Sequence, residues 1–357
     1  MKVAIRADAS VQIGSGHAVR CLTLADELRA RGAEVLFISR AHQGGARALL
    51  EQRGYTCVVL PAPTISDALL GDLAHSAWLG VSMEEDLAQT AAAVQGWAAD
   101  WLVVDHYAID WRWERAMRSY VPRIMAIDDL ADRRHDCDLL LDQNFYCDME
   151  TRYEGLVPAH CRCLLGPSYA LLRAEFAAVS RPHREQGAVK RLRWRRGGAE
   201  RDPAPATAPR GRNEAASAGI AIDVVLGAAA PHLEQVRALC DVTPNVHLHV
   251  QIDNMAELMA SADLAIGACG SATWERCFLG LPTITIVLAD NQRKSAHDLA
   301  QAGYIVNLGD VETVTPHAVA RAVHAMIEDP AGRAAMSHRV EALASRRGPI
   351  AADLICE

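Results

Sequence analysis

Two glycines beside a histidine form the first group of residues that could do chemistry. The stretch from Arg6 to His17 reads RADASVQIGSGH and follows an apolar run. Gly14 and Gly16 permit a tight turn and close approach of the backbone to a ligand, and they place His17 at the start of the next expected helix. The positive end of a helix favours the neutral imidazole, which can accept a proton near pH 7. His17 is therefore a candidate general base, and a capping or surface histidine is the alternative.

A second candidate site follows the apolar run that ends at Gly267. Residues 267–275 read GACGSATWE, and an Asn-Gln pair follows at 291–292. Free N–H groups at the start of a helix, together with the hydroxyls of Ser271 and Thr273, would bind an anion. Glu275 lies about one turn into that helix, where it could accept hydrogen bonds from ribose hydroxyls. This pattern is typical of a nucleotide site, and a capped helix with Glu275 in the cap is the alternative.

Carboxylates occur at the ends of two further apolar runs. Asp105 precedes His106 and Tyr107, and Asp128 precedes Asp129. Paired carboxylates can bind a divalent cation, but no third ligand accompanies them at a recognisable spacing. The G-S-G-H spacing also differs from G-x-G-x-x-G, which disfavours a nicotinamide site. We therefore expect neither a metal nor a cofactor.

Apolar runs alternate with helical patterns along the chain, which indicates parallel sheets covered on both faces. The strands expected in the first half are Val3–Ala7, Glu34–Ser39, Cys57–Leu60, Trp101–His106, Arg123–Asp128 and Leu139–Asp142, with a helix over Ala18–Arg31. Those expected in the second half are Ile222–Leu226, Val246–Gln251, Leu264–Gly267, Thr283–Leu288 and Tyr304–Leu308, with helices over 231–240, 255–262, 271–280, 292–302 and 315–328. The pattern predicts an α/β protein of two Rossmann-like domains that face each other across a cleft, where ligands bind at the carboxyl ends of the strands.

Composition argues against several classes of protein. The chain has 357 residues, 50% of them hydrophobic, and a formal net charge of -8, which argues against a general nucleic-acid binder. No apolar run approaches the roughly 20 residues that span a bilayer, and the N-terminus reads as a strand rather than a secretory signal. The ten cysteines form no C-x-x-C pair, so buried free thiols and a cytoplasmic location are expected. Composition does not indicate the oligomeric state.

One segment interrupts the alternation. Between Arg181 and Glu214 the chain has ten Lys or Arg residues against four Asp or Glu, and it is rich in Pro and Ala. It has neither a strand pattern nor an amphipathic period, which is typical of a linker or a disordered insert; an RNA-binding patch is the alternative. We therefore expect an N-terminal domain over 1–180, an irregular basic segment over 181–218 and a C-terminal domain over 219–357.

Several motifs, taken in order, resemble one family. The N-terminal IRADASVQIGSGHAVRCLTLA, then VVDHYAID, IDDLADRRHDCDLLLDQN, YEGL and GPSYALLRAEF are similar to the UDP-2,4-diacetamido-2,4,6-trideoxy-β-L-altropyranose hydrolases of pseudaminic acid biosynthesis. The run GSATWERCFLGLPTITIVLADNQ resembles the nucleotide domain shared with the lipid II-forming N-acetylglucosaminyltransferase. The resemblance implies the two-domain GT-B fold, a UDP-sugar substrate bound between the domains, and a place in the pathway that leads to flagellin glycosylation.

The resemblance also assigns roles to residues. It makes His17 the catalytic base, and it implies substrate contacts from Gly16, Tyr107, Arg173 and Asn291 and UDP contacts from Gly270, Ser271, Thr273, Glu275 and Gln292. Because UDP is a good leaving group, the reaction needs activated water and stabilisation of charge on the diphosphate rather than a carboxylic acid. We therefore expect hydrolysis of the C1–O bond with inversion.

The sequence departs from this family at the start of the second domain. An apolar strand and a Gly-Gly loop are expected there, but residues 190–198 read KRLRWRRGG. Arginines buried without partners in a central strand would cost several kcal/mol each. A local reading-frame shift or family divergence would produce this composition. We expect the second domain to be perturbed at its first strand, with the strand and helix around 193–217 missing.

Two other functions fit the same residues. A glycosyltransferase of the same fold would pass the sugar to an acceptor, although no apolar or basic patch for a membrane lipid acceptor stands out in the first half. A non-catalytic UDP-sugar-binding protein would bind without releasing UDP. We expect no nucleic-acid partner and no membrane insertion.

Overall fold

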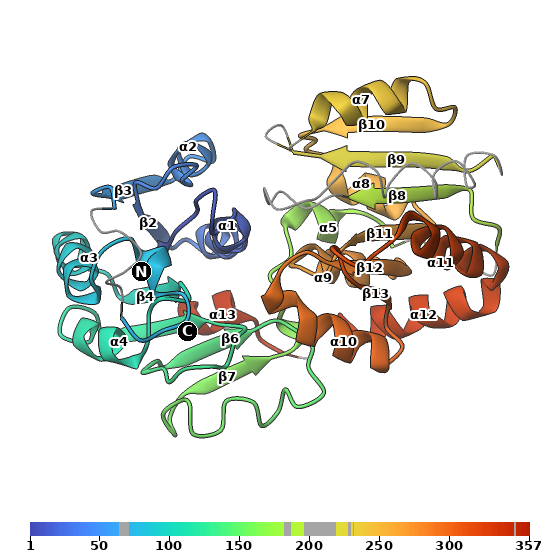
Figure 1. The fold of residues 1–357 in the computed structure, drawn as a ribbon. Coiled ribbons are helices and arrows are strands. Elements are labelled where there is room, and N and C mark those ends of the chain that lie inside the picture. Colours follow the sequence, from blue (N-terminus) through green and yellow to red (C-terminus); the bar gives the residue numbers. More distant parts are fainter. Residues whose placement is uncertain (64–70, 182–186, 196–218, 228–229, 231, 346–347) are drawn as a thin grey trace. The chain divides into compact units, whose positions relative to one another are not determined.

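The chain folds into two α/β units (Figure 1). The computed structural model describes residues 1–63, 71–181, 187–195, 219–227, 230, 232–345 and 348–357. The first unit comprises residues 1–144, 148–171 and 347–357, and the second comprises residues 145–147 and 172–346. Each unit is built on its own parallel sheet, as the alternation of apolar and helical patterns predicted.

The first unit contains a seven-stranded parallel sheet with the order β3-β2-β1-β4-β5-β6-β7. Its strands are β1 (Lys2–Ala7), β2 (Glu34–Arg40), β3 (Thr56–Leu60), β4 (Trp101–Asp105), β5 (Arg123–Ile127), β6 (Leu139–Asp142) and β7 (Arg162–Leu165). The central strands are nearly continuous apolar runs because both of their faces are covered. The six strands expected in this half are all present, and β7 is an additional one.

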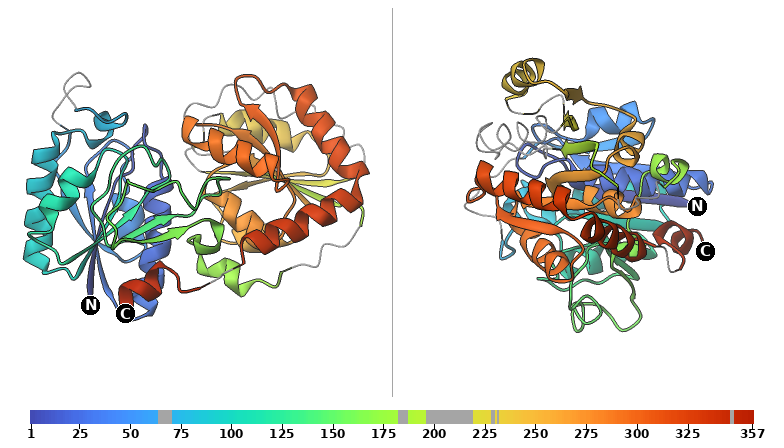
Figure 2. Two further views of the ribbon diagram at one scale, coloured as in Figure 1. Left: turned by 90° about the horizontal axis from the view of Figure 1, so that it is seen from below. Right: turned by 90° about the vertical axis from the view of Figure 1, so that its right-hand side faces the viewer.

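Helices cover both faces of this sheet (Figure 2). The elements of the first unit outside the sheet are α1 (Gly16–Ala30), α2 (Arg47–Gln52), η2 (Ser76–Leu79), α3 (Met83–Trp97), α4 (Trp111–Met117), η3 (Pro167–Tyr169) and α13 (Ala351–Cys356). Successive strand residues face opposite ways. Val3 and Ile5 therefore pack into the core beneath α1, whereas Ala4 packs into the core beneath α3 and α4.

The second unit contains a six-stranded parallel sheet with the order β10-β9-β8-β11-β12-β13. Its strands are β8 (Arg191–Arg195), β9 (Ala221–Leu226), β10 (Val246–Val250), β11 (Leu264–Ala268), β12 (Thr283–Val287) and β13 (Val306–Asp310). The accompanying elements are α5 (Ala174–Ala178), α7 (Leu233–Asp241), α8 (Met255–Ala260), α9 (Ala272–Phe278), η5 (Asp290–Gln292), α10 (Arg293–Gln301), α11 (Pro316–Glu328) and α12 (Pro330–Leu343).

The arginine-rich strand forms, so the prediction that it is missing was wrong for residues 191–195. β8 pairs with β9 on one side and with β11 on the other. Leu192 and Trp194 are buried, and the guanidinium of Arg191 lies 3.1 Å from the Asp223 carboxylate on β9. Arg193 is also buried and donates to the sulfur of Met255. The burial cost expected for arginines does not arise at Arg191, because its side chain is 39% exposed. The expected helix and the rest of the irregular segment, residues 196–218, lie outside the described residues.

The C-terminal helix belongs to the first unit, which differs from the expected domain over 219–357. Helix α13 packs against α1, where Ala351 and Ile355 are fully buried in the same core as β1. The guanidinium of Arg31 binds one carboxylate oxygen of Asp353 at 2.6 and 2.9 Å. The sequence pattern did not predict this packing, because the six residues of α13 carry no signal of where they pack.

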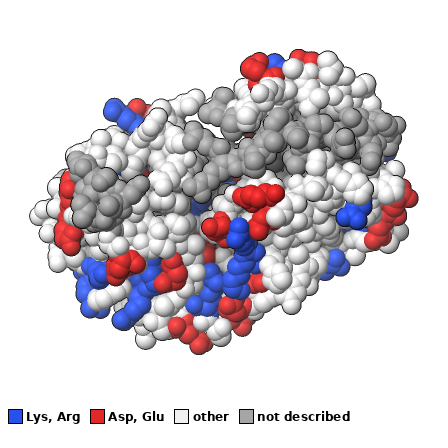
Figure 3. Space-filling model, in the orientation of Figure 1, with Lys and Arg blue, Asp and Glu red and all other residues white. Residues whose placement is uncertain are grey.

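The surface carries charges of both signs. On the face shown in Figure 3, Lys and Arg side chains lie among Asp and Glu side chains. Exposed arginines such as Arg112 and Arg115 pair with Asp72 and Asp136. Among the described residues, no helix has both the length and the apolar composition that crossing a bilayer requires.

We predict that Ile355→Ala destabilises the first unit by about 2–5 kcal/mol, because the substitution leaves a cavity in the core between α13 and the sheet. Denaturant unfolding followed by circular dichroism measures the change. Val242→Ala, at a position that is 77% exposed, is the matched control and should change stability by less than about 0.5 kcal/mol. Equal stability of the two variants would contradict the packing of α13.

Candidate functional site

A short turn after β1 delivers His17 to the start of α1. The Ser10 hydroxyl accepts hydrogen bonds from the N–H groups of Gln12 and Ile13, and the Gly14 N–H donates to the Ser10 carbonyl at 2.8 Å. Gly14 has a φ of +78°, which glycine adopts without strain. The turn lies at the carboxyl end of the sheet, and it leaves His17 only 8% exposed.

The imidazole of His17 contacts the last residue of the neighbouring strand. Its Nδ1 lies 2.5 Å from Oδ1 of Asp105, which ends β4 and pairs in register with Ala7 of β1. An ionised carboxylate only accepts hydrogen bonds, so Nδ1 carries a proton, and in the neutral imidazole Nε2 then keeps the lone pair. The carboxylate of Asp105 therefore fixes the tautomer in which Nε2 can act as a base.

Arg20 keeps the Asp105 carboxylate ionised. Burial alone would raise the pKa of Asp105, but the charges of Arg20 and His17 outweigh it, and the pKa lies well below its usual value. Nε and Nη2 of Arg20 each lie 2.6 Å from an Asp105 oxygen, a bidentate arrangement. The remaining Nη1 reaches Oδ2 of Asp129 at 3.0 Å. One guanidinium thus joins the carboxylates that follow β4 and β5.

Tyr107 is held beside His17 by the second of these carboxylates. Its hydroxyl donates to Oδ1 of Asp129, whose other oxygen accepts from the side-chain amide of Asn144 at 3.2 Å. The rings of Tyr107 and His17 meet edge to face with 4.6 Å between centroids. Two of the residues expected in the site, His17 and Tyr107, are therefore brought together in the first unit.

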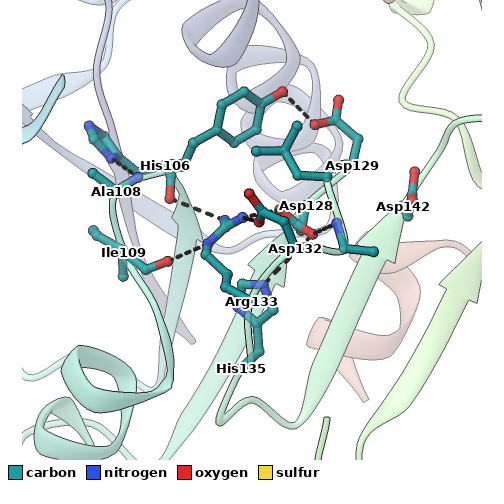
Figure 4. A network of polar contacts seen from close by, with 12 residues as sticks. His106, Ala108, Ile109, Asp128, Asp129, Asp132, Arg133, His135 and Asp142 are labelled. Atoms are coloured by element: carbon teal, nitrogen blue, oxygen red, sulfur yellow. Dashed lines mark hydrogen bonds and ion pairs between the residues drawn. The ribbon is translucent and has the colours of Figure 1, made fainter. Parts of the chain in front are cut away.

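The adjacent Asp128 points into a different network (Figure 4). Its carboxylate pairs with Arg133 at 2.8 Å and accepts from the N–H of Ala131 at 2.9 Å. His135 lies between this carboxylate and Glu114, with 2.8 Å from its Nδ1 to Oε1 of Glu114. Burial alone would lower the pKa of His135, but these carboxylates raise it to about 10.

The Asp128–Asp129 pair is therefore divided between two sets of partners rather than directed at one point. Within the described part of the chain, no group of three His, Cys, Asp or Glu side chains is arranged to hold a metal ion. The sequence pattern indicated only a possible cation ligand at Asp105, whereas in the structure the Asp105 carboxylate contacts the imidazole of His17.

The second group of expected site residues lies in the second unit, where β11 leads into α9. Ser271 is exposed just before α9, and Gly270 lies next to it. A Cβ at Gly270 would lie 3.8 Å from Nε2 of Gln292, so this side chain flanks the same loop. Oε1 of Gln292 accepts from the N–H of Leu288 at 3.1 Å, and Asn291 is exposed. The loop after β11 and the turn after β12 thus form one edge.

Glu275 and Arg173, expected to contact UDP and substrate respectively, form an ion pair. Nε of Arg173 lies 2.8 Å from Oε1 of Glu275, and Nη1 lies 2.6 Å from Glu175. Burial alone would lower the pKa of Arg173, but Glu275 and Glu175 raise it. Their charges are therefore partly neutralised by each other.

Thr273 does not fit its expected role in this conformation. Its side chain is 1% exposed, and its hydroxyl accepts from Nη2 of Arg276 at 2.9 Å. The hydroxyl therefore lies inside the unit, where a nucleotide cannot contact it. Residues three or four positions apart lie on the same face of a helix. Where that face of α9 packs against the core, a hydroxyl contacts core residues and not a ligand.

Comparison with known proteins relates both units to enzymes named for sugar nucleotides. Residues 212–348 match the glycosyltransferase family 28 C-terminal domain. The UDP-2,4-diacetamido-2,4,6-trideoxy-beta-L-altropyranose hydrolase of Campylobacter jejuni is 27% identical over 317 residues, which is 86% of this chain and 98% of that protein. The resemblance to this hydrolase is confirmed. It extends along most of the chain and through both units.

Solved structures relate the fold to glycosyltransferases. The glycosyltransferase SnogD from Streptomyces nogalater has a TM-score of 0.66 at 15% identity, with 99% of this chain and 97% of that chain covered. Arabidopsis thaliana UGT89C1 complexed with quercetin has a TM-score of 0.69 at 13% identity, over 100% and 99% of the two chains. The GT-B type of fold implied by the sequence resemblance is thereby confirmed.

We predict that the stability of the first unit depends on the protonation of His135. A histidine whose folded pKa is about 10, above its ordinary 6.5, contributes its full stabilisation below pH 6.5 and loses it as the pH rises toward 10. The free energy of unfolding should therefore fall over this range by up to about 1.4 kcal/mol per pH unit.

Denaturant unfolding at several pH values measures this slope. In His135→Gln the slope between pH 6.5 and 10 should be smaller by the contribution of one proton. His160→Gln removes a histidine whose side chain is 60% exposed and should keep the original slope. Identical slopes for the original protein and His135→Gln would show that His135 is neutral in the fold.

Proposed function

We propose that this protein hydrolyses a UDP-linked 2,4-diacetamido-2,4,6-trideoxy sugar at its C1–O bond, releasing UDP and the free sugar for pseudaminic acid synthesis. Two findings support the substrate class: the similarity to the Campylobacter jejuni hydrolase along 86% of the chain, and the family 28 domain over residues 212–348. The observation that carries the proposal is the contact between His17 and Asp105, because it supplies a base with a defined tautomer.

The proposed reaction is one displacement. Nε2 of His17 takes a proton from water as the water oxygen bonds to C1, and the C1–O bond to the diphosphate breaks with its electron pair leaving on the diphosphate oxygen. Asp105 stabilises the imidazolium that forms, since its carboxylate already accepts the Nδ1 proton. Attack opposite the leaving group inverts the configuration at C1. The step uses no cofactor.

Residues of the second unit are proposed to hold the nucleotide. The exposed Ser271 hydroxyl and the backbone at Gly270 offer hydrogen-bond donors without a side chain in the way, and Gln292 lies beside them. The carboxylate of Glu275 is fixed by Arg173, which orients it for ribose hydroxyls. Asn291, Tyr107 and Gly16 are retained as proposed substrate contacts. Thr273 is not retained as a proposed UDP contact, because its side chain is buried.

A glycosyltransferase is the second candidate function. The likeness to SnogD and the family 28 domain favour it, because both carry the glycosyltransferase name. His17 would then take the proton of an acceptor hydroxyl instead of water. The two reactions differ in whether UDP release requires an acceptor, and a non-catalytic binder would bind UDP without any release.

We predict that the protein releases UDP from the proposed sugar nucleotide without an added acceptor. Proton NMR of a freshly quenched reaction should show the free sugar with the anomeric configuration opposite to that of the substrate. Release only after an acceptor is added would establish the transferase. Binding of UDP in calorimetry with no release would establish the binder, and retention at C1 would exclude a single displacement.

We predict that His17→Asn lowers kcat about 10²–10⁴-fold, because the general base is removed. Asp105→Asn should lower kcat by at least about tenfold, because an amide no longer fixes the Nε2 lone pair. Initial rates of UDP release measure both. The affinity for UDP should stay unchanged in each, and thermal melting checks that each variant folds. His160→Asn, at an exposed histidine, is the matched control. Full activity of His17→Asn would contradict the proposal.

A further inference from the structure

An aromatic cluster lies around His17, and two of its members, His75 and Trp78, have no role in the proposed mechanism. It consists of His17, His75, Trp78 and Tyr107. The ring of Trp78 stacks on that of Tyr107 with centroids 5.5 Å apart and an interplanar angle of 27°. Trp78 lies 6.3 Å from the His17 ring, and His75 lies 4.5 Å from Trp78 and 5.3 Å from Tyr107. Four rings thus meet at the carboxyl end of β4.

The turn that carries Trp78 is fixed in place. Leu79 and Val81 are 3% and 1% exposed and pack in the core beneath α3. Gly80 between them has a φ of +73°, and a Cβ there would lie 2.8 Å from the ring of Pro63. The Ser76 hydroxyl donates to the Leu73 carbonyl at 2.7 Å and accepts from the Leu73 N–H. The chain is anchored on both sides of Trp78.

Trp78 itself stays partly exposed on this anchored turn. The part of an apolar ring that stays in contact with water contributes no hydrophobic stabilisation to the fold. A ring that is already held in one position loses little conformational entropy when a ligand covers it. Burial, together with Arg133 and His17, lowers the pKa of His75 against the opposing charges of Asp132 and Asp129, which favours the uncharged imidazole. The cluster therefore presents a neutral, aromatic surface beside the proposed base.

The ligand chemistry that fits such a surface is the apolar face of a pyranose ring. Aromatic faces carry partial negative charge and attract the partly positive C–H groups of a sugar. The substrate class proposed above has a methyl group at C6 and two acetamido methyl groups, which add apolar surface. Ligand sites in general combine aromatic walls with a few polar groups.

We infer that the indole of Trp78 is a binding wall for the sugar ring of the sugar nucleotide. This inference rests on the proposed function, because it places the sugar next to His17. It goes beyond that function by assigning recognition of the sugar, as distinct from UDP, to the turn at residues 75–78. Contact with about 50 Å² of apolar sugar surface corresponds to about tenfold in affinity.

Calorimetric titration of UDP and of the proposed UDP-sugar tests this assignment. Both titrations are run in the His17→Asn background, which prevents turnover, with and without Trp78→Ala. We expect Trp78→Ala to weaken the UDP-sugar about tenfold and to leave the affinity for UDP unchanged. Trp78→Phe, which keeps an aromatic face, should restore most of the loss. Trp97→Ala is the matched control, because Trp97 is a partly exposed tryptophan at the end of α3, just before β4 begins.

Three results would overturn the inference: equal loss for both ligands, no loss for either, or the same loss in Trp97→Ala. Thermal melting of each variant separates a folding defect from a binding defect, and Trp78→Phe gives a second reading if Trp78→Ala unfolds. UDP release by the unsubstituted protein is measured separately. Absence of release together with a selective loss in Trp78→Ala would refute the proposed function and leave the sugar-binding wall supported.

Discussion

The contact between the buried Asp105 carboxylate and the His17 imidazole is the interaction on which the candidate site of the first unit depends. The Asp105 carboxylate could not be buried alone, because a charge without partners in the interior costs several kcal/mol. Asp105 is fully buried and accepts hydrogen bonds from His17 and from Nε and Nη2 of Arg20. The same guanidinium reaches Asp129, which holds Tyr107. Burial thus makes one connected network of residues that come from α1, β4 and the loop after β5.

The parallel sheet explains why these residues meet. All strands of a parallel sheet end at the same edge, so the residues at the ends of β1, β4 and β5 are neighbours. His17 thus contacts Asp105, 88 positions away, and Arg20 contacts Asp129, 109 positions away. The second unit repeats this arrangement with the loops after β11 and β12, where Gly270 and Gln292 lie close together. In both units the expected functional residues lie at the carboxyl edge of the sheet.

Sequence patterns predicted all the strands except β7 and β8, and they located the turn that carries His17. Continuous apolar runs marked β1, β4 and β11 to within a residue or two, because buried parallel strands leave no alternation to misread. Glycines marked the turn before His17. The partners of that histidine were harder to predict, because a carboxylate at a strand end fits a metal, an arginine or an imidazole equally well. Arg20 carried one weak signal, its position one helical turn after His17.

Three features of the structure, namely strand β8, the packing of α13 and the direction of the Thr273 side chain, were not predicted from the sequence. β8 contains arginines that local composition assigns to a solvated loop, yet the strand pairs with β9 and β11, and its Leu192 and Trp194 are buried. Helix α13 is too short to show where it packs. The Thr273 side chain points into the unit. There Nη2 of Arg276 donates hydrogen bonds to the Thr273 hydroxyl and to the Ala268 carbonyl. For β8 and α13 the decisive partners come from the tertiary fold, whereas Thr273 and Arg276 lie one turn apart in α9.

The central claim is that Asp105 fixes the tautomer of His17 with the proton on Nδ1. Nitrogen-15 NMR of histidine-labelled protein near pH 8, with His17→Asn used to assign the signals, measures this directly. The account predicts a protonated Nδ1 and an unprotonated Nε2 for His17, and a loss of this preference in Asp105→Asn. A protonated Nε2 with a bare Nδ1 in the unsubstituted protein would contradict it.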